Sequence, residues 1–339
     1  MKLLRLALSN FRGVPSGTYD LSHPQSGEPL DLVVVTGPNG TGKTAMLRAI
    51  IAAKESVGAY GARPDATALV HRGSTDGSIH ATWSLSEDEV RRSGLSRNTW
   101  ETSMELGPKA APPSVDPGLA KLFAQYLHHP THGKLELFPA NRCLDSSRGR
   151  GASPPLSEKA EARLRVSADR AKYGCIRSWL LGLGMQDMAR AAERIATRGV
   201  ALRHDLTDSL APVKRSIAAL APHLRLVGIR PRPDSDGYDV IFQHRDGAEV
   251  ELDELSDGER QAVLFAAAFE RIQLHGSIVL IDHPELFFHP SEHVRAVQTI
   301  AALGKDNQVI VTTTSQEILA SVARHQTIQL KYGAPYACS

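Results

Sequence analysis

The sequence has no long apolar run, few aromatic residues and almost no cysteine. No stretch approaches the roughly 18 consecutive apolar residues of a membrane-spanning helix, and Met1–Asn10 alternates like a strand, without a signal-peptide core. The three cysteines, Cys143, Cys175 and Cys338, have no CxxC or zinc-type spacing. These absences exclude a membrane-spanning helix and fit reduced thiols in a cytoplasmic protein.

An excess of charge of one sign is also missing. Lys and Arg number 39 against 37 Asp and Glu, which gives a formal net charge of +2. This balance excludes a protein coated in positive charge but permits a local basic patch. The 339 residues, 42% of them apolar, suit one large domain with an insertion, or two lobes, and exclude wholesale disorder.

A buried-strand pattern leads directly into a phosphate-binding loop. The apolar run Leu32–Val35 predicts a parallel strand, Gly37–Thr44 reads GPNGTGKT, and Ala45–Ile51 predicts a helix. This is the G-x-x-x-x-G-K-T motif in its required strand–loop–helix context. Backbone amides of such a loop surround phosphate oxygens, Lys43 reaches the β- and γ-phosphates, and the Thr44 hydroxyl ligates Mg²⁺. The predicted nucleotide-binding residues are Asn39, Gly40, Thr41, Gly42, Lys43 and Thr44.

A second apolar run, Ser277–Asp282, ends in an acid. In phosphate-loop folds, a hydrophobic strand brings an aspartate to the carboxyl edge of the sheet, where the aspartate holds Mg²⁺. Many buried strands end in aspartate, so the pattern gains its specificity from the phosphate loop. The combination predicts a metal site formed by Thr44 and Asp282.

A turn containing serine and glycine precedes that strand. Residues Leu255–Gln261 read LSDGERQ and open the apolar helix predicted over Ala262–Ile272. A serine, a glycine and a helix N-terminus together suit a phosphate presented from outside. The turn resembles the signature of the ABC-type ATPases, and the resemblance implies that Ser256, Gly258 and Glu259 contact nucleotide.

Further motifs narrow the resemblance to the RecF, SMC and OLD branch of these ATPases. Leu6–Gly13 resembles the opening strand and NFR element of the branch, whose arginine, here Arg12, lies near the nucleotide. Leu280–Glu285 (LIDHPE) resembles the LIDEPE motif, Phe288–Ser291 the LHPS D-loop, and Val309–Leu319 the last core strand and switch. The resemblance implies an α/β fold: a P-loop NTPase head of ABC type with a mixed central sheet, a flanking antiparallel β-subdomain and a helical lobe.

Two positions that bear on hydrolysis depart from the family pattern. Asp282 is followed by His283 where the family has its catalytic glutamate, and the switch histidine is replaced by Thr314. The family glutamate polarises the attacking water; a neutral imidazole can also accept its proton, and Glu285 is an alternative acid. We expect slow or partner-dependent hydrolysis that involves these four residues, with no hydrolysis and ordinary turnover left as alternatives.

Several histidines near the D-loop invite a zinc interpretation. Their spacing is not H-E-x-x-H, and Pro290 breaks the helix that a pair of His289 and His293 would need. The D-loop resemblance already accounts for His289, so no zinc site is predicted.

The motifs frame nearly the whole chain and suggest three segments. Residues 1–145 are expected to form the N-terminal part of the ATPase lobe, with the phosphate loop and the β-subdomain. Residues 146–230 are expected to form a helical lobe in place of a coiled coil, because no sustained heptad is visible. Residues 231–339 are expected to complete the ATPase lobe with the signature, Walker B strand, D-loop and switch.

The resemblance also implies partners. In this family each signature caps the ATP held by another protomer, so we expect a head-to-tail dimer of two copies, or a pair with a related ATPase subunit. Residues 142–177 hold nine Lys or Arg against four acids, which indicates either a DNA contact or a solvated helix face. The chain to Ser339 leaves no room for a Toprim nuclease domain, so an effector is expected in trans.

The predicted function is an ATP- and Mg²⁺-dependent head of the DNA-repair or anti-phage type that dimerises on ATP and gates a partner effector. The main alternative is a non-hydrolysing, ATP-bound scaffold of a larger complex. A weaker third reading is the ATPase head of a chromosome-organising protein.

Overall fold

A computed structural model of the protein describes residues 1–144, 157–198, 207–232 and 237–332. The chain forms two compact units, one of residues 1–140, 156–168 and 273–339, and one of residues 141–155 and 169–272. This division differs from the three segments expected from the sequence, because the signature helix belongs with the helical segment. None of the described helices combines the length and apolar character that crossing a membrane requires.

The first unit contains a five-stranded sheet in the order β12-β3-β11-β10-β6. All of its strand pairs are parallel, and the antiparallel strands expected in a mixed central sheet lie in a separate sheet. The strands are almost continuously apolar because the sheet is covered on both faces. Their bounds are β3 Leu32–Thr36, β6 Leu135–Phe138, β10 Ile278–Asp282, β11 Gln308–Thr313 and β12 Thr327–Gln329.

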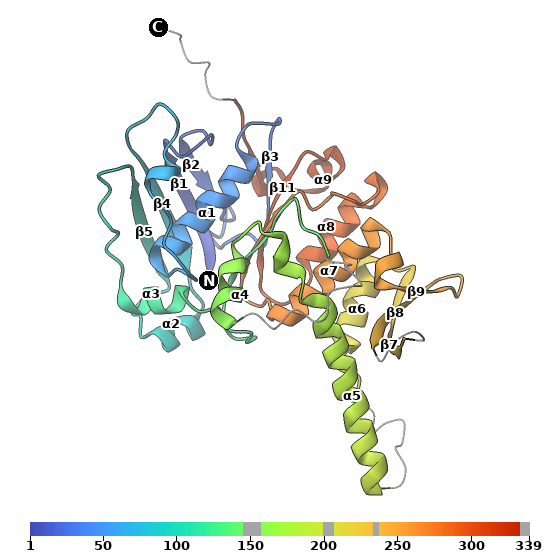
Figure 1. Cartoon of the computed structure of the whole chain (residues 1–339). Helices are drawn as coiled ribbons and strands as arrows, with labels where there is room; N and C mark the ends of the chain where they lie inside the picture. The colour runs from blue at the N-terminus through green and yellow to red at the C-terminus, as the bar shows by residue number, and fades with distance from the viewer. Residues whose placement is uncertain (145–156, 199–206, 233–236, 333–339) are drawn as a thin grey trace. The chain divides into compact units, whose positions relative to one another are not determined.

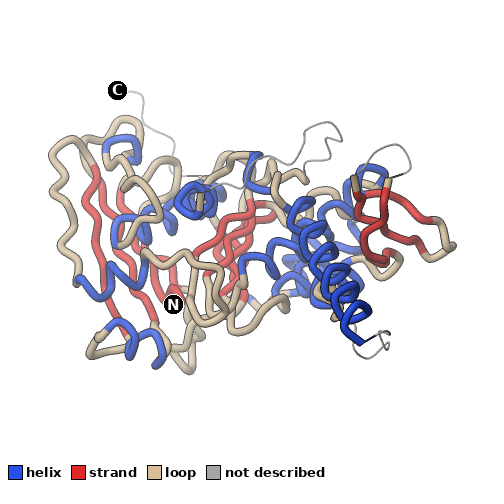
Figure 2. Tube along the Cα trace, turned by 60° about the horizontal axis from the view of Figure 1, so that its bottom comes forward, coloured by secondary structure: helices blue, strands red, loops and turns tan. Residues whose placement is uncertain are grey.

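An antiparallel sheet, β2-β1-β4-β5, forms the flanking subdomain of the same unit (Figure 2). Its strands share one hydrophobic core with β3, β10, β11 and helix α1. The bounds are β1 Lys2–Ser9, β2 Gly17–Asp20, β4 Gly77–Ser84 and β5 Thr99–Leu106. The helices of this unit are α1 Lys43–Val57, α2 Glu87–Ser93, α3 Pro117–Phe123, α4 Glu158–Arg165, α8 His293–Ala301 and α9 Gln316–Ser321.

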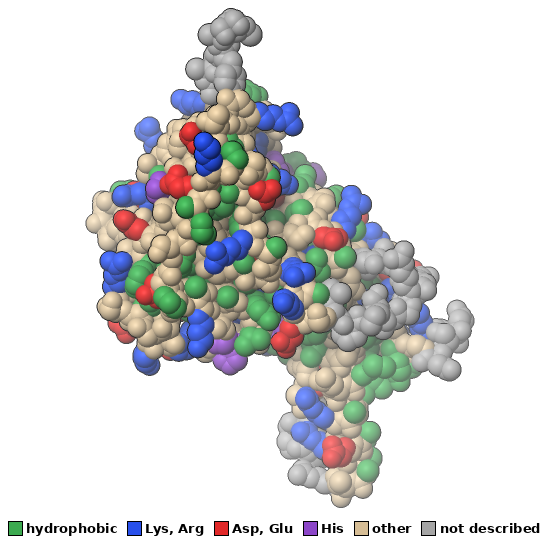
Figure 3. All heavy atoms as spheres, turned by 60° about the vertical axis from the view of Figure 1, so that its left-hand side comes forward, with side chains coloured by type: hydrophobic (Ala, Val, Ile, Leu, Met, Phe, Trp, Pro, Cys, Tyr) green, Lys and Arg blue, Asp and Glu red, His purple; other side chains and the backbone are tan. Residues whose placement is uncertain are grey.

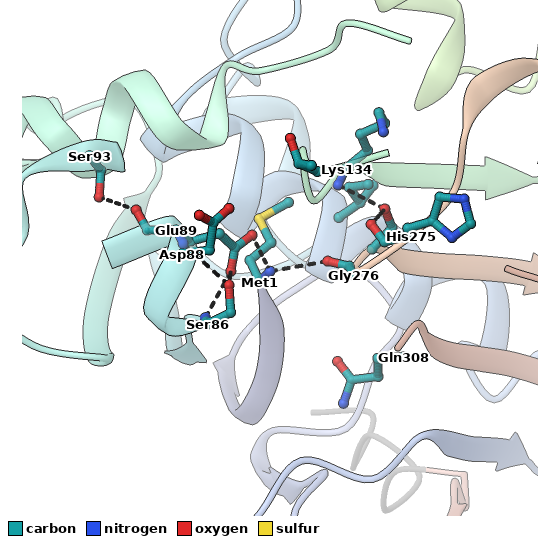
Figure 4. A network of polar contacts seen from close by, with 12 residues as sticks. Met1, Ser86, Asp88, Glu89, Ser93, Lys134, His275, Gly276 and Gln308 are labelled. Atoms are coloured by element: carbon teal, nitrogen blue, oxygen red, sulfur yellow. Dashed lines mark hydrogen bonds and ion pairs between the residues drawn. The ribbon is translucent and has the colours of Figure 1, made fainter. Parts of the chain in front are cut away.

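Buried polar contacts fasten the two sheets of this unit together (Figure 4). The side-chain amide of Gln308, at the start of β11, accepts from the backbone N–H of Leu3 at 2.7 Å and donates to its carbonyl oxygen at 2.8 Å. Nearby, the amino group of Met1 donates to the Glu89 carboxylate and to the carbonyl oxygen of Gly276. These bonds fix β1 against β11, and Arg12 follows β1 in the chain.

The second unit contains helices and a three-stranded antiparallel sheet, β7-β8-β9. Helix α6 packs on α7, and Gly184 of α5 allows close contact with Ile229 of β7, whose side chain lies 2.7 Å from where a Cβ would stand. The far half of α5 extends away from this sheet (Figure 1). The bounds are α5 Ile176–Arg198, α6 Ala211–Leu220, β7 Leu224–Pro231, β8 Tyr238–His244, β9 Glu249–Glu251 and α7 Asp257–Ile272.

A lysine on the buried side of α1 lies in the core. The ammonium of Lys54 donates to Glu55 at 2.8 Å and lies 2.9 Å from the centre of the Tyr60 ring. Burial lowers the pKa of Lys54 to about 7, against the opposing attraction of Glu55. Burial also lowers the pKa of Lys134 to about 7. Both lysines are therefore easier to deprotonate in the folded protein than in the unfolded chain.

We expect the free energy of unfolding to rise between pH 7 and pH 10. In this range the unfolded chain keeps the Lys54 proton that the folded protein has lost, so the unfolded state binds more protons and stability increases with pH. Lys54→Met should reduce this slope by up to about 1.4 kcal/mol per pH unit. Urea denaturation at several pH values measures the slope. The exposed Lys109→Met is the control, and an equal slope in both variants would contradict the assignment.

Candidate functional site

The phosphate loop connects the end of β3 to the start of α1, and two of its glycines are sterically required. Gly37 has φ +150°, and a Cβ there would lie 2.4 Å from the carbonyl oxygen of Leu330. Gly42 has φ +95°, and a Cβ there would lie 2.7 Å from the carbonyl oxygen of Gly13. Both positions therefore exclude larger residues, and the loop backbone can approach a ligand closely.

Lys43 and Thr44 begin α1 inside this loop. The Lys43 ammonium donates to the carbonyl oxygens of Gly37 at 2.8 Å and Pro38 at 3.1 Å. Burial lowers the pKa of Lys43, while the charge of Asp282 opposes the shift. The lysine is therefore a desolvated cation held over the loop.

Asp282 lies at the carboxyl end of β10, beside Thr44. The Thr44 hydroxyl is 2.9 and 3.1 Å from the two carboxylate oxygens, and Thr312 of the neighbouring strand also donates to Asp282. A hydroxyl and a carboxylate are the hard oxygen donors that Mg²⁺ prefers. The predicted metal-binding residues therefore lie together, and their chemistry fits this ion.

His283 and Glu285 form a hydrogen-bonded pair just beyond Asp282. His283 has φ +52°, and its backbone N–H donates to the carbonyl oxygen and the hydroxyl of Thr312, both at 3.1 Å. Its Nδ1 lies 3.1 Å from Glu285 Oε1, which also accepts from the backbone N–H of Thr314 at 3.2 Å. Burial alone would raise the pKa of Glu285, but these hydrogen bonds outweigh it and hold the pKa below its usual value.

The hydrogen bond between His283 and Glu285 indicates different roles for the two residues. A carboxylate at Nδ1 favours the tautomer in which Nδ1 carries the proton and Nε2 is the accepting nitrogen. Glu285 is buried, whereas His283 lines the cavity described next. The geometry therefore favours His283 over Glu285 as the group that meets a ligand, with Glu285 orienting it.

A cavity of about 430 Å³ brings most of the predicted residues of this unit together. It is lined by Arg12, Asn39, Gly40, Gly42, Lys43, Thr44, Ala45, Arg48 and His283. Among the described residues that line it there are three cations and no acid, which suits a polyphosphate. Burial and the charge of Arg48 lower the pKa of Arg12. Thr41 lies in the loop wall, where its hydroxyl donates to the carbonyl oxygen of Pro38 at 2.8 Å.

The signature turn lies in the second unit, at the start of α7. Ser256 is exposed, but Glu259 is buried and accepts from the backbone N–H and the hydroxyl of Ser256 at 2.9 and 2.8 Å. His223 and His244 lie 3.0 Å from the other Glu259 oxygen. The Glu259 carboxylate, expected from the resemblance to contact nucleotide, is turned inward in this structure and holds the turn. Ser256 is exposed, and Gly258 lies two residues further on.

The fold matches known proteins over nearly its whole length. A crystal structure of an Smc head bound to the C-terminal winged-helix domain of ScpA has a TM-score of 0.51 at 13% identity, covering 94% of this chain and 92% of that chain. An Smc head with an extended coiled coil, bound to the C-terminal domain of ScpA from Pyrococcus furiosus, has a TM-score of 0.51 at 12% identity, with coverages of 98% and 94%. The chain has the fold of an SMC head.

A family model agrees with this assignment over part of the chain. The AAA_21 model, described as "AAA domain, putative AbiEii toxin, Type IV TA system", matches residues 186–320 of this chain. That segment contains the signature, the strand ending in Asp282, and the switch position Thr314. The resemblance to the ABC-type ATPases of the RecF and SMC branch is thereby confirmed at the level of the fold.

Four of the nine basic residues in the stretch 142–177 are buried or ion-paired. Arg142 donates to Gln261 at 2.8 Å, and its guanidinium lies 5.1 Å from the centre of the Phe265 ring. Arg177 forms ion pairs with two aspartates of its own unit. The residues removed from solvent in this way are Arg142, Arg165, Lys172 and Arg177. These four side chains are therefore occupied within the protein, and a DNA contact would depend on the other basic residues of the stretch.

The other five basic residues of the stretch are exposed or not described. Lys159, Arg163 and Arg170 are exposed, and Arg148 and Arg150 lie outside the described residues. On the face shown in Figure 3, basic and acidic side chains are scattered rather than gathered in one patch. DNA binding through residues 142–177 stays an expectation from the sequence.

Two residues of the candidate site were missed by sequence reasoning. Arg48 stands four positions after Thr44 on α1, and helical spacing could have indicated that both face the same cavity. Thr312 pairs in register with Asp282 across two parallel strands. No local pattern could have identified it, because the two positions become neighbours only when the sheet forms.

Proposed function

We propose that this SMC-type head binds ATP with Mg²⁺, pairs with a second copy around the nucleotides, and uses the ATP-bound state to control a partner effector. The observation that carries the proposal is the convergence of Lys43, Thr44, Asp282 and His283 at the carboxyl edge of the parallel sheet. Parallel α/β sheets bind ligands at this edge. The cationic cavity beside these residues suits a triphosphate.

Each residue has a defined task in this proposal. Lys43 binds the β- and γ-phosphates, and Thr44 with Asp282 holds Mg²⁺, which neutralises phosphate charge when bound. His283 accepts the proton of the attacking water at Nε2, and Glu285 stabilises the imidazolium that forms. Thr314 offers no imidazole to the γ-phosphate, so we expect turnover to be slow without a partner.

The dimer depends on the signature turn. Ser256 is exposed at the start of α7, where a serine hydroxyl and helix N-terminus can meet the γ-phosphate held by another copy. We expect wild type to dimerise with ATP. Ser256→Arg should remain monomeric because the longer side chain fills the phosphate contact, while its own ATP site stays intact.

Light scattering with and without ATP measures the mass of each variant. Ser178→Arg, at an exposed serine on α5 of the same unit, is the matched control and should dimerise like wild type. A fluorescent ATP analogue verifies that all three proteins bind nucleotide. Identical oligomers for wild type and Ser256→Arg in both conditions would contradict the sandwich dimer.

The effector function rests on the comparisons. The matching family model is described in terms of a toxin–antitoxin system, and the similar solved Smc heads are bound to a separate protein, ScpA. The family description supports a role in a defence-type system, and the solved heads support action through a partner protein. A pull-down from the native host with ATP, comparing wild type with Lys43→Ala, tests this: a partner retained equally by both proteins would contradict control of the partner by the ATP-bound state.

A further inference from the structure

Arg48 lines the cationic cavity, although no sequence motif assigns it a role. It is exposed on α1 and faces the cavity together with Arg12 and Lys43. Arg48 follows Thr44 by four residues, which is about one helical turn or roughly 6 Å along the helix axis. It therefore lies beside the phosphate loop without being part of it.

Arg12 reaches the same cavity from the segment that follows β1. Its backbone has φ +43°, in the left-handed region that residues other than glycine rarely adopt. Its N–H donates to the carbonyl oxygen of Leu69 at 3.0 Å, and its own carbonyl oxygen contacts the imidazole of His71. Such strained conformations, held in place by their surroundings, cluster at ligand sites. The local fold thus fixes Arg12 at the wall of the cavity.

The two guanidinium groups have no anion to balance them. Within the part of the chain that the structure describes, neither arginine has a carboxylate partner, and no acid lines the cavity. The Nε of Arg12 is buried without a hydrogen-bond partner among the same residues. Burial, and then the charge of Arg48, lowers the pKa of Arg12, so the two cations repel each other. An anion bound between them would relieve this repulsion.

The arginine pair and Lys43 feel different charges. Asp282 and Glu285 act on Lys43, where they oppose the lowering of its pKa by burial. The charged group that acts on Arg12 is instead Arg48. This difference places the arginines on the side of the cavity away from the metal-binding carboxylate. In phosphate-loop proteins the lysine and the metal take the β- and γ-phosphates. The phosphate that remains for the arginine pair is the α-phosphate.

We propose that Arg48, together with Arg12, binds the α-phosphate of the nucleotide and thereby raises the affinity for ATP and ADP alike. The role rests on the proposed function, because it requires that the cavity holds a nucleoside polyphosphate. A guanidinium offers a planar fork of donors that matches a phosphate group, and two of them can hold one phosphate from both sides. Arg48 is in this sense a residue that determines which ligands the cavity accepts.

The test compares the affinities for ATP and for ADP, each with Mg²⁺, in wild type and Arg48→Gln. Glutamine keeps the polarity of the side chain but carries no charge. We expect isothermal titration calorimetry to show about a tenfold loss for both nucleotides, because both carry the α-phosphate. Unchanged affinities would overturn the proposal. A loss confined to ATP would also overturn it, because Arg48 would then contact the γ-phosphate.

Arg91→Gln is the matched control. Arg91 is an exposed arginine on α2 in the same unit, and it does not line the cavity. The control removes the same charge from the protein and should bind both nucleotides like wild type. An equal loss in Arg91→Gln and Arg48→Gln would mean that overall charge sets the affinity, and would contradict a contact made by Arg48.

A measurement without nucleotide separates this proposal from the proposed function. Because Arg12 and Arg48 repel each other in the free protein, Arg48→Gln should unfold at the same temperature as wild type or at a higher one. A lower unfolding temperature would show that Arg48 stabilises the fold rather than holding a ligand, and would overturn the proposal. Wild type that binds neither ATP nor ADP would instead contradict the proposed function, whatever the unfolding temperatures.

Discussion

Lys43→Ala is expected to lower the affinity for ATP at least about a hundredfold, because the phosphates lose the one cation held within the loop. Lys43 is buried, and its ammonium lies over the carbonyl oxygens of Gly37 and Pro38, where the β- and γ-phosphates would be bound. Arg12 and Arg48 also line the cavity and leave a weak residual attraction. Isothermal titration calorimetry with ATP and Mg²⁺ measures the loss.

Two further variants separate this effect from general changes of charge or folding. Lys109→Ala removes an exposed lysine of the same unit and should bind ATP like wild type. Lys43→Arg keeps the charge but not the shape, and should recover only part of the affinity. Thermal unfolding without nucleotide verifies that Lys43→Ala is folded. Near-normal ATP affinity in folded Lys43→Ala would rule out the phosphate-loop assignment.

His283→Ala is expected to reduce the rate of ATP hydrolysis about a hundredfold while ATP binding stays intact, because the accepting imidazole is lost. Glu285→Gln should reduce the rate less, by about tenfold, since it removes only the charge that orients and stabilises the imidazole. The double variant should be no slower than His283→Ala, because both residues act through one proton transfer. Single-turnover hydrolysis of radiolabelled ATP is sensitive enough to compare slow variants.

The pattern of losses distinguishes the remaining mechanisms. If His283→Ala keeps its activity and Glu285→Gln loses it, then Glu285 is the base. In that case His283 would orient Glu285, the reverse of the roles proposed above. If wild type and both single variants share one low rate, neither residue promotes hydrolysis, and the ATP-bound scaffold becomes the better account. Glu292→Gln, at a partly exposed acid on the same segment, is the control for general loss of charge.

Contiguous motifs were sufficient to predict the phosphate-loop part of the candidate site. The residues of the phosphate loop, from Gly37 to Thr44, follow one another in the chain, and the strand and helix around them have clear apolar patterns. Asp282 could be added because a parallel strand that ends in an acid brings it to the same edge of the sheet. Residues that follow one another in the chain remain neighbours after folding. The phosphate loop could therefore be predicted without knowledge of tertiary contacts.

Long-range contacts decided the rest. The sequence placed His283 and Thr314 at hydrolysis positions, but only the folded sheet showed that the Thr314 backbone holds Glu285, which in turn orients His283. From the sequence, Arg142 was part of a stretch expected to contact DNA, and Glu259 was expected to contact nucleotide. In the structure both side chains are buried and hydrogen-bonded within the protein.

The physical reason is that a sequence motif specifies which groups are present, while burial and hydrogen-bond partners determine what each group can do. The sequence by itself determined the class of fold, the phosphate loop and the acid beside it, because each depends on neighbouring residues and a known strand direction. Only the tertiary structure showed which charged side chains form internal hydrogen bonds and ion pairs, and how the histidines are oriented. Those outcomes depend on residues that are distant in the chain and meet only in the folded sheet.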